Sequence, residues 1–278
     1  MTITTTRIGG ALGAEVTGVD LSQPLNPAIR DEIYAALLEH LVLYFRDQPL
    51  THEQHTALGA AFGTLNIHPF HKAIPDYEYV LEILKEPGDP LNIGGYWHSD
   101  VTFLEEPVMG SILYAAELPP AGGDTIFANT YLTYEALSPG LQAMLEPMMA
   151  MHSARRGFGE AGLKRGLRGI SNEVEDTRVY AEVEHPVVRT HPETGRKILF
   201  VNPYFTIRFA DMEEAESRPL LDYLCRLTES PEYTFRLRWE KHTVAFLDNR
   251  CTQHFAVNDY PGQRRRLYRV AINGERPI

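Results

Sequence analysis

The sequence predicts an antiparallel β-sandwich or barrel with helices packed against its outside. From about residue 78 onward, short segments alternate apolar and polar residues with a period of two, and clusters of glycine and proline separate them, which is typical of antiparallel strands. Apolar residues at helical spacing are confined to a few segments. We find no linker, internal repeat or low-complexity segment, so we expect one domain spanning residues 1–278.

The N-terminal part of the chain predicts scaffold elements. The segment AEVTGVDLSQPL indicates a short strand followed by a turn. Pro27 then begins a helix that leads into a buried strand at residues 41–45. Thr51 and Gln54 form a capping-box pattern, which opens a second helix that ends near Phe62. The first helix is amphipathic, and its apolar face consists of Ile29, Ile33, Ala36 and Leu37.

Seven later segments have the alternation of strands. We expect strands at Met109–Ala116, Thr125–Ala128, Pro186–Thr190, Lys197–Val201, Thr234–Trp239, Val244–Leu247 and Arg264–Ile272. A helix begins at Ser138 and Pro139, and a second carries leucines at helical spacing, both on the outside of the sheets. Those leucines are Leu220, Leu221, Leu224 and Leu227. Residues 155–178 are rich in glycine and charge, and we expect a functional lid there, with a solvated loop as the alternative.

The charge balance excludes some partners. The formal net charge is -11 and the pI is about 5.5, which argues against binding nucleic acid or an anionic membrane surface. An anionic ligand must therefore be bound by a local cluster of positive charge. Neither a signal peptide nor a bilayer-spanning apolar run is apparent, so we expect a cytoplasmic protein. Its two cysteines, Cys225 and Cys251, are too few for a disulfide framework and are expected to be reduced.

His98 and Asp100 suggest a metal site. On a strand, side chains at positions i and i+2 leave the same face, with about 6.6 Å between their Cα atoms, so both can reach one ion. Of the eleven histidines, His254 stands out because it follows the apolar strand at residues 244–247, whereas His52 and His55 are expected to be solvated on a helix surface. Two histidines and one aspartate form the facial triad of non-haem Fe(II), which leaves positions open for a chelating co-substrate and dioxygen.

The last predicted strand carries four arginines. A period of two places Arg265, Leu267 and Arg269 on one face and Arg264, Arg266 and Tyr268 on the other. Arginines on the inward face need buried anions, because an unpaired buried charge is very costly. Those anions are either structural Asp and Glu residues or two acid groups of ligands, such as carboxylates or sulfonates held by the guanidinium fork.

Four motifs together resemble the TauD/TfdA family of Fe(II)- and 2-oxoglutarate-dependent dioxygenases. They are W-H-S-D-V-T-F at 97–103, G-G-D-T at 122–125, D-N-R-x-T-Q-H at 248–254, and Q-R-R at 263–265 followed by Arg269. The likeness covers nearly the whole chain, and the family includes taurine, alkylsulfatase and aryloxyalkanoate dioxygenases. It implies a mainly β fold with a double-stranded β-helix core, of the jelly-roll or cupin-like kind, and flanking helices. It also implies a homodimer or homotetramer.

The resemblance also implies roles for individual residues. His98, Asp100 and His254 would bind Fe(II), and O₂ would take the last position. Arg265, assisted by the hydroxyl group of Thr125, would bind the distal carboxylate of 2-oxoglutarate while the 2-oxo acid end chelates the iron. Arg269 would hold the acidic group of the primary substrate. The other substrate contacts implied are His68, Tyr96, Phe158 and Phe205.

Two departures from the family pattern bear on the substrate. Gly94, Gly95 and Tyr96 stand where taurine enzymes carry a polar, amide-bearing segment, and Leu247 replaces a tryptophan common before D-N-R. We therefore expect a more apolar or more open pocket, and hydroxylation of an aliphatic carbon in a sulfonate, an alkyl sulfate ester or an aryloxyalkanoate. Two alternatives stay open: a zinc metallohydrolase that uses the same three residues, and a non-catalytic jelly-roll module that binds a small anion.

Overall fold

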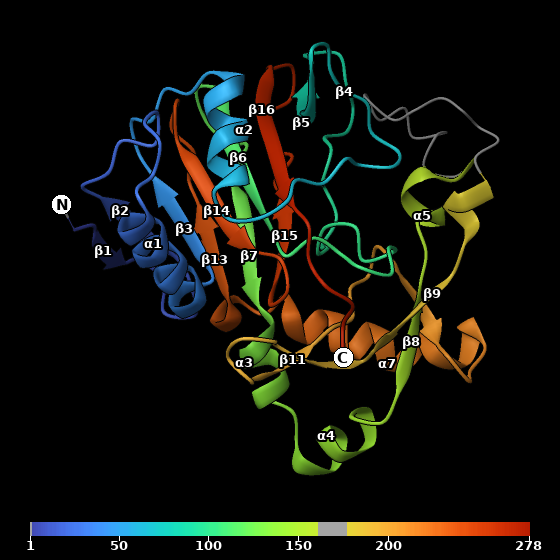
Figure 1. Cartoon of the computed structure of the whole chain (residues 1–278). Helices are drawn as coiled ribbons and strands as arrows, with labels where there is room; N and C mark the ends of the chain where they lie inside the picture. The colour runs from blue at the N-terminus through green and yellow to red at the C-terminus, as the bar shows by residue number, and fades with distance from the viewer. Residues whose placement is uncertain (1, 161–176) are drawn as a thin grey trace.

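A large mixed sheet forms the centre of the molecule (Figure 1). The computed structural model describes residues 2–160 and 177–278, so most of the expected lid, residues 161–176, lies outside the described residues. Only β2 and β3 pair in parallel; the other strand pairs in this sheet are antiparallel. The sheet has the order β1 (Thr4–Arg7), β2 (Ala14–Thr17), β3 (Val42–Phe45), β14 (Val244–Asp248), β6 (Gly110–Glu117), β16 (Arg265–Ile272), β5 (Tyr77–Lys85) and β4 (Ala73–Ile74).

A three-stranded sheet packs against one face of the large sheet and closes the core. Its order is β13 (Thr234–Leu237), β7 (Thr125–Asn129) and β15 (Thr252–Ala256), and all its pairs are antiparallel. Leu113 and Leu267 of the large sheet share one hydrophobic cluster with Phe127 and Leu237 of the small sheet. The predicted jelly-roll core is thus two facing sheets, each with alternate side chains directed into the space between them.

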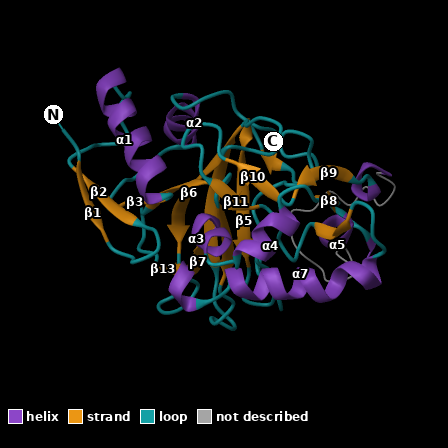
Figure 2. Ribbon diagram, turned by 90° about the horizontal axis from the view of Figure 1, so that it is seen from below, coloured by secondary structure: helices purple, strands orange, loops and turns teal. Residues whose placement is uncertain are grey.

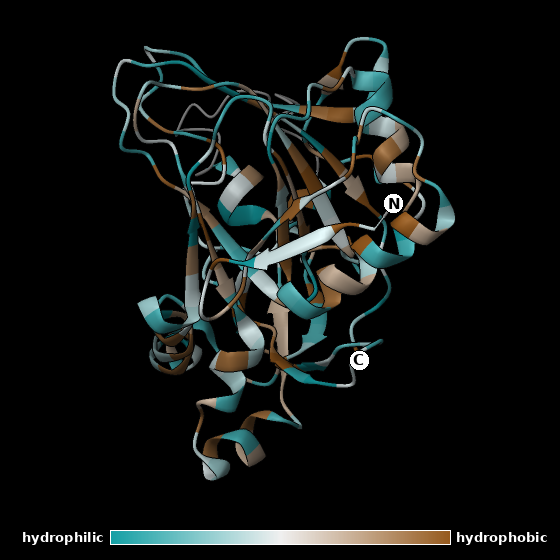
Figure 3. Cartoon of the chain, turned by 90° about the vertical axis from the view of Figure 1, so that its left-hand side faces the viewer, coloured by the Kyte–Doolittle hydropathy of each residue, from teal (hydrophilic) through white to brown (hydrophobic). Residues whose placement is uncertain are grey.

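Two helices cover the outer face of the large sheet. α1 (Pro27–His40) and α2 (His52–Ala60) contribute Leu37 and Leu58 to a cluster with Ile112 and Phe246. The amphipathic first helix and the capping box of Thr51 with the α2 residue Gln54 are as predicted. Figure 3 shows hydrophobic and hydrophilic residues alternating around such helices, because one face of each is buried.

His55 corrects one expectation. Its side chain is only 1% exposed, and its Nε2 atom lies 3.0 Å from the carbonyl oxygen of Ile112. Burial lowers the pKa of His55 to about 4, so the ring is neutral near pH 7 and its Nε2–H group donates this hydrogen bond. The helix was predicted correctly, but this position faces the sheet rather than solvent.

A third layer lies below the sheets in the view of Figure 1, and it faces the viewer in Figure 2. The helices α3 (Thr130–Glu135), α4 (Pro139–Leu145) and α7 (Glu214–Thr228) form a further apolar cluster with the smaller strands. Ser138 caps α4, and Leu221 and Leu224 of α7 are buried, as the sequence predicts. The smaller strands form two sheets, one of β12 (Thr206–Phe209), β8 (Met149–His152) and β9 (Val183–Pro186) and one of β10 (Val188–Thr190) and β11 (Lys197–Leu199). The described residues also form the short helices α5 (Arg155–Phe158), η1 (Thr177–Tyr180) and η2 (Pro231–Tyr233).

Candidate active site

A backbone bridge joins the two histidines. His254 lies in β15, and His98 lies in an extended segment that is not part of a longer strand. The N–H of His98 donates to the carbonyl of His254 at 3.2 Å, and the N–H of His254 donates to the carbonyl of His98 at 2.8 Å. This reciprocal pair places the two rings side by side, with their centroids 4.2 Å apart.

Asp100 completes the group, although not from a regular strand as expected. It begins a turn, but the chain is extended through Ser99, so the side chains of His98 and Asp100 still point the same way. Oδ1 of Asp100 is 3.7 Å from Nε2 of His98 and 3.9 Å from Nε2 of His254. One potential ligand atom from each residue lies within 4.8 Å of the others, and all three residues are buried.

The protonation of these residues suits a divalent cation. Nδ1 of His98 lies 2.6 Å from the carbonyl oxygen of Tyr96, so Nδ1 carries the proton and the lone pair of Nε2 faces Asp100. Burial lowers the pKa of His98, and burial together with His98 lowers the pKa of His254 to about 3, so both rings are neutral. Although burial opposes it, Arg269 and the two histidines hold the pKa of Asp100 below its usual range.

Two neutral imidazoles and one carboxylate that converge on one point fit a bound Fe(II) ion. This donor set is the facial triad of non-haem iron enzymes, and its nitrogen lone pairs and carboxylate oxygen are available without a change of protonation. Ser111 adds to the fit, because its hydroxyl donates to Oδ2 of Asp100 at 2.7 Å and leaves Oδ1 directed at the histidines.

Arg265 is a buried cation that forms no direct ion pair with a carboxylate among the described residues. Its side chain leaves the inward face of β16, and the residue is 3% exposed. Nε donates to the carbonyl of Gly123 at 2.9 Å, and one terminal nitrogen lies 3.4 Å from Oγ1 of Thr125. Trp239 also donates to Oγ1 of Thr125, at 2.9 Å, so the Thr125 hydroxyl accepts twice and its own proton is left to donate to a third group.

One cavity connects these residues to the candidate metal ligands. The polar residues of its lining are the candidate ligands His98, Asp100 and His254 together with Thr125, Arg265 and Arg269. The walls between them are apolar and come from Ile83, Ile93, Leu113, Ala256 and Leu267. The shape and charge suit a short diacid, with one acid end at the metal and the other at the guanidinium group.

Arg269 has a protein carboxylate as a partner, which is the first of the two alternatives raised by the sequence. Its terminal nitrogen lies 2.6 Å from Oδ1 of Asp100, and its Nε atom is buried without a hydrogen-bond partner. Arg269 borders the cavity of Arg265 and also a second cavity that Arg265 does not border. It therefore contacts a candidate metal ligand and a pocket at once.

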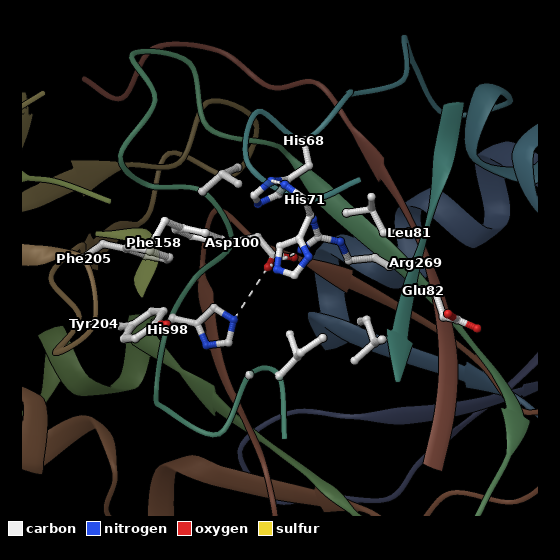
Figure 4. A pocket seen from close by; sticks show the side chains of 14 residues that line it. His68, His71, Leu81, Glu82, His98, Asp100, Phe158, Tyr204, Phe205 and Arg269 are labelled. Carbon is white, nitrogen blue, oxygen red and sulfur yellow. Dashed lines mark hydrogen bonds and ion pairs between the residues drawn. The ribbon is translucent and has the colours of Figure 1, made fainter. Parts of the chain in front are cut away.

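The second cavity has aromatic walls (Figure 4). His68, Phe158, Phe205 and Arg269 line it together. Nδ1 of His68 accepts hydrogen bonds from the backbone N–H groups of residues 70 and 71, at 3.0 and 2.9 Å, so its Nε2 carries the proton. Burial, Arg269 and His71 hold the pKa of His68 well below its usual range, and this histidine is a neutral donor.

Tyr96 reaches this cavity only through another residue. Its ring stacks on the ring of Tyr204, with centroids 5.0 Å apart and an interplanar angle of 6°, and Tyr204 itself borders the cavity. Sequence reasoning missed Tyr204 and His71 as lining residues. Their positions in the sequence could have indicated both residues. Tyr204 is next to the predicted contact Phe205, and His71 is three residues after the predicted contact His68.

A second buried group, His191, Asp248 and Cys251, also brings potential metal ligands together. Backbone N–H groups donate to Nδ1 of His191, so Nε2 carries the proton and donates to Oδ2 of Asp248 at 3.1 Å. Arg250 binds both oxygens of the same carboxylate, at 2.9 and 2.7 Å. His191 has no free lone pair and Asp248 is neutralised, so this group is a structural ion pair.

Comparison with known proteins agrees with the site. The family model described as "Taurine catabolism dioxygenase TauD, TfdA family" matches residues 4–271. An alkylsulfatase of Acinetobacter baylyi is 36% identical over 275 residues, covering 97% of this chain and 84% of that protein. An alpha-ketoglutarate-dependent sulfate ester dioxygenase of Pseudomonas putida is 36% identical over 276 residues, covering 98% and 89%. The crystal structure of AAD-2 with Mn(II) and N-oxalylglycine superimposes with a TM-score of 0.84 at 28% identity, covering 100% and 99%.

The chain belongs to the TauD, TfdA family. The prediction of an Fe(II)- and 2-oxoglutarate-dependent dioxygenase with a jelly-roll core is thereby confirmed. Among the described residues, no helix is both long enough and apolar enough to cross a membrane.

Proposed function

We propose that this enzyme hydroxylates an aliphatic carbon of a small organic anion, and that a sulfate ester or a sulfonate is the leading substrate class. In the overall reaction, 2-oxoglutarate and O₂ give succinate and CO₂, and one oxygen atom enters the substrate as a hydroxyl group. An aryloxyalkanoate is the third candidate substrate, as the sequence motifs suggest. The similarity to relatives named "Alkylsulfatase" and "Alpha-ketoglutarate-dependent sulfate ester dioxygenase" supports our choice of sulfate esters as the first class to test.

One observation carries the proposal. A single cavity joins the metal candidates His98, Asp100 and His254 to Arg265, whose buried guanidinium group forms no direct ion pair with a carboxylate among the described residues. A buried guanidinium without a carboxylate is costly unless a ligand supplies one. A zinc hydrolase needs no cation in the same cavity to bind a second acid group, so the cavity favours the dioxygenase.

Each residue of the chain then has a physical task. His98, Asp100 and His254 would hold Fe(II), which when bound supplies the redox chemistry that activates O₂. Arg265 and the Thr125 hydroxyl would bind and orient the distal carboxylate of 2-oxoglutarate. The apolar walls of the cavity exclude water from the co-substrate.

The aromatic cavity would bind the primary substrate. Arg269 supplies charge, and the Nε2–H group of the neutral His68 supplies a second donor, so together they suit a sulfate, sulfonate or carboxylate group. Phe158 and Phe205 would pack against the apolar part of the substrate and orient the reacting C–H bond. If the hydroxylated carbon bears a sulfate ester oxygen, the product collapses to an aldehyde or ketone and releases sulfate.

The test has two stages. Anaerobic addition of Fe(II) and 2-oxoglutarate to the purified chain should give the weak visible charge-transfer band of the chelated pair. Exposure to O₂ with a panel of alkyl sulfates, sulfonates and aryloxyalkanoates should then form succinate in equal amount to the substrate consumed. Substrate turnover that does not require 2-oxoglutarate would establish a hydrolase instead, and a chain that binds an anion but no metal would be a non-catalytic module.

Two further expectations belong to the same proposal. We infer a cytoplasmic location and a homodimeric or homotetrameric state, both on the basis of family resemblance and composition. Fractionation of cells and light scattering of the purified protein test them.

A further inference from the structure

The turn that presents Asp100 has an unfavourable backbone conformation. Val101, the next residue, has a φ of 48°, in the left-handed region that a β-branched residue rarely adopts. Val101 is 2% exposed, so solvent does not stabilise this turn. A conformation of this kind costs about 1–3 kcal/mol and persists only where neighbouring groups hold it. The groups that hold this turn therefore decide where the carboxylate of Asp100 lies.

The side chain of Asn249 holds both sides of Asp100. Its Oδ1 atom accepts a hydrogen bond from the backbone N–H of Asp100 at 2.6 Å, and its Nδ2 atom donates to the backbone carbonyl of Asp100 at 3.0 Å. Nδ2 also donates to the carbonyl of Val108 at 2.9 Å, beyond the turn. Both protons of the amide and its oxygen are thus used on this one segment.

Asn249 is itself held firmly. It is 1% exposed and directly follows β14, and its own backbone N–H donates to the carbonyl of Met109 at 2.9 Å. Its amide therefore projects from the rigid large sheet onto the segment of Asp100. The sequence motif D-N-R contains this residue, and its neighbours Asp248 and Arg250 form the structural ion pair described above.

We propose that Asn249 is a positioning residue for the metal ligand Asp100. It holds the Asp100–Val101 turn in its strained conformation, so the carboxylate meets His98 and His254 before any metal binds. The inference rests on the proposed metal site. A ligand held in place needs no reorganisation when the ion arrives, and loss of such a supporting contact typically weakens metal binding by about 10–100-fold.

Asn129 offers a matched control. It is also a buried asparagine that makes three side-chain hydrogen bonds, but these cap the first turn of α3 and contact the carbonyl of Ala11. If Asn249 were only structural, replacing either asparagine with alanine would lower stability, and the two variants would have the same affinity for the metal.

The experiment titrates Mn(II) into the metal-stripped full chain and follows the free ion by electron paramagnetic resonance. We expect Asn249→Ala to weaken Mn(II) binding by about 10–100-fold. Asn129→Ala should stay within about 2-fold of the wild type, although urea unfolding shows a similar loss of stability in both variants. Equal Mn(II) affinity of Asn249→Ala and the wild type, or an equal loss in both variants, would overturn the proposal.

A second variant guards against failure of Asn249→Ala to fold. Asn249→Asp keeps the shape and the acceptor but replaces the two amide donors, and it adds acidity near the site. Electrostatic attraction alone would tighten Mn(II) binding, whereas lost positioning should weaken it to a value between those of the wild type and the alanine variant. Tighter or unchanged binding in Asn249→Asp counts against the role of Asn249. If the wild type itself binds no Mn(II), the proposed metal site fails instead, so the two failures are distinguishable.

Discussion

Arg265 and Arg269 lie four residues apart on the same face of β16, yet only Arg269 has a carboxylate partner among the described residues. Arg269 pairs with Asp100 at 2.6 Å, whereas Arg265 contacts the carbonyl of Gly123 and the hydroxyl of Thr125. Both arginines border the cavity that contains Thr125, but only Arg269 of the two also borders the aromatic cavity. This asymmetry predicts separate tasks for the two arginines.

We expect Arg265→Ala to weaken 2-oxoglutarate binding by about 30–1000-fold, because it removes the cation that faces the distal carboxylate in a buried site. The KM of the primary substrate should change much less. Arg269→Ala should show the reverse pattern. Anaerobic titration of 2-oxoglutarate and steady-state kinetics measure the two affinities.

Arg266 is the matched control for both substitutions. It lies between them on β16, but its side chain is 28% exposed and pairs with Glu82 at 3.0 Å on the opposite face. Arg266→Ala should leave both affinities within about 2-fold, because a partly exposed ion pair on the opposite face of the strand contacts neither ligand and contributes little. If Arg265→Ala and Arg269→Ala reduce both affinities equally, the division of tasks is wrong.

Replacement of His254 by alanine should remove metal binding without leaving a charged group unpaired. Its ring is neutral, and its Nδ1 atom has no partner in the structure. We therefore expect the fold to survive, as judged by circular dichroism, and Mn(II) affinity to fall by more than about 100-fold, since one of three ligands is lost. Wild-type Mn(II) affinity in His254→Ala would exclude this residue from the metal site.

Thr125→Val tests the hydroxyl group beside Arg265. The substitution keeps the shape of the side chain but removes the donor expected to reach 2-oxoglutarate, and it leaves Nε1–H of Trp239 without its acceptor. We expect 2-oxoglutarate binding to weaken by about 10–150-fold, corresponding to one lost hydrogen bond to a charged group, and Mn(II) binding to be unchanged. Thr125→Ser retains the hydroxyl and should bind 2-oxoglutarate nearly as well as the wild type; equal losses in the valine and serine variants would assign the effect to packing.

The buried His55 predicts a loss of stability in mild acid. Its pKa is about 4 in the folded protein, against 6.5 for a free histidine, so the unfolded chain binds a proton more readily. Its contribution to stability is complete above pH 6.5 and is lost as the pH falls toward 4, by about 3 kcal/mol in all. Urea unfolding at pH 7 and pH 5 measures the change. His55→Gln should lose about 2 kcal/mol less between these values than the wild type, and an identical pH dependence in both proteins would contradict the assignment.

The strand at residues 110–117 was predictable because it is a short, mostly apolar segment, and its first six residues are all buried. The expected range 109–116 differs from β6 by one residue at each end. β15 was not predicted, although it carries His254, because its polar residues Thr252 and Gln253 are buried instead of solvated. A strand that lines a polar site lacks the apolar alternation by which strands are found. The polar residues beside the candidate metal site thus removed the alternating pattern that would have predicted β15.

The sequence alone determined everything that depends on spacing within one segment: the shared direction of His98 and Asp100, the inward face of Arg265 and Arg269, and the first residues of α1, α2 and α4. These follow from backbone periods of about 2 and 3.6 residues, which need no partner.

Only the tertiary structure decided the contacts between distant segments, namely the bridge between His98 and His254, the ion pair of Arg269 with Asp100, and the hold of Asn249 on the turn at Val101. These contacts are decided when the two sheets close around a shared core, because strand register and sheet packing, rather than any local period, bring such residues within hydrogen-bond distance.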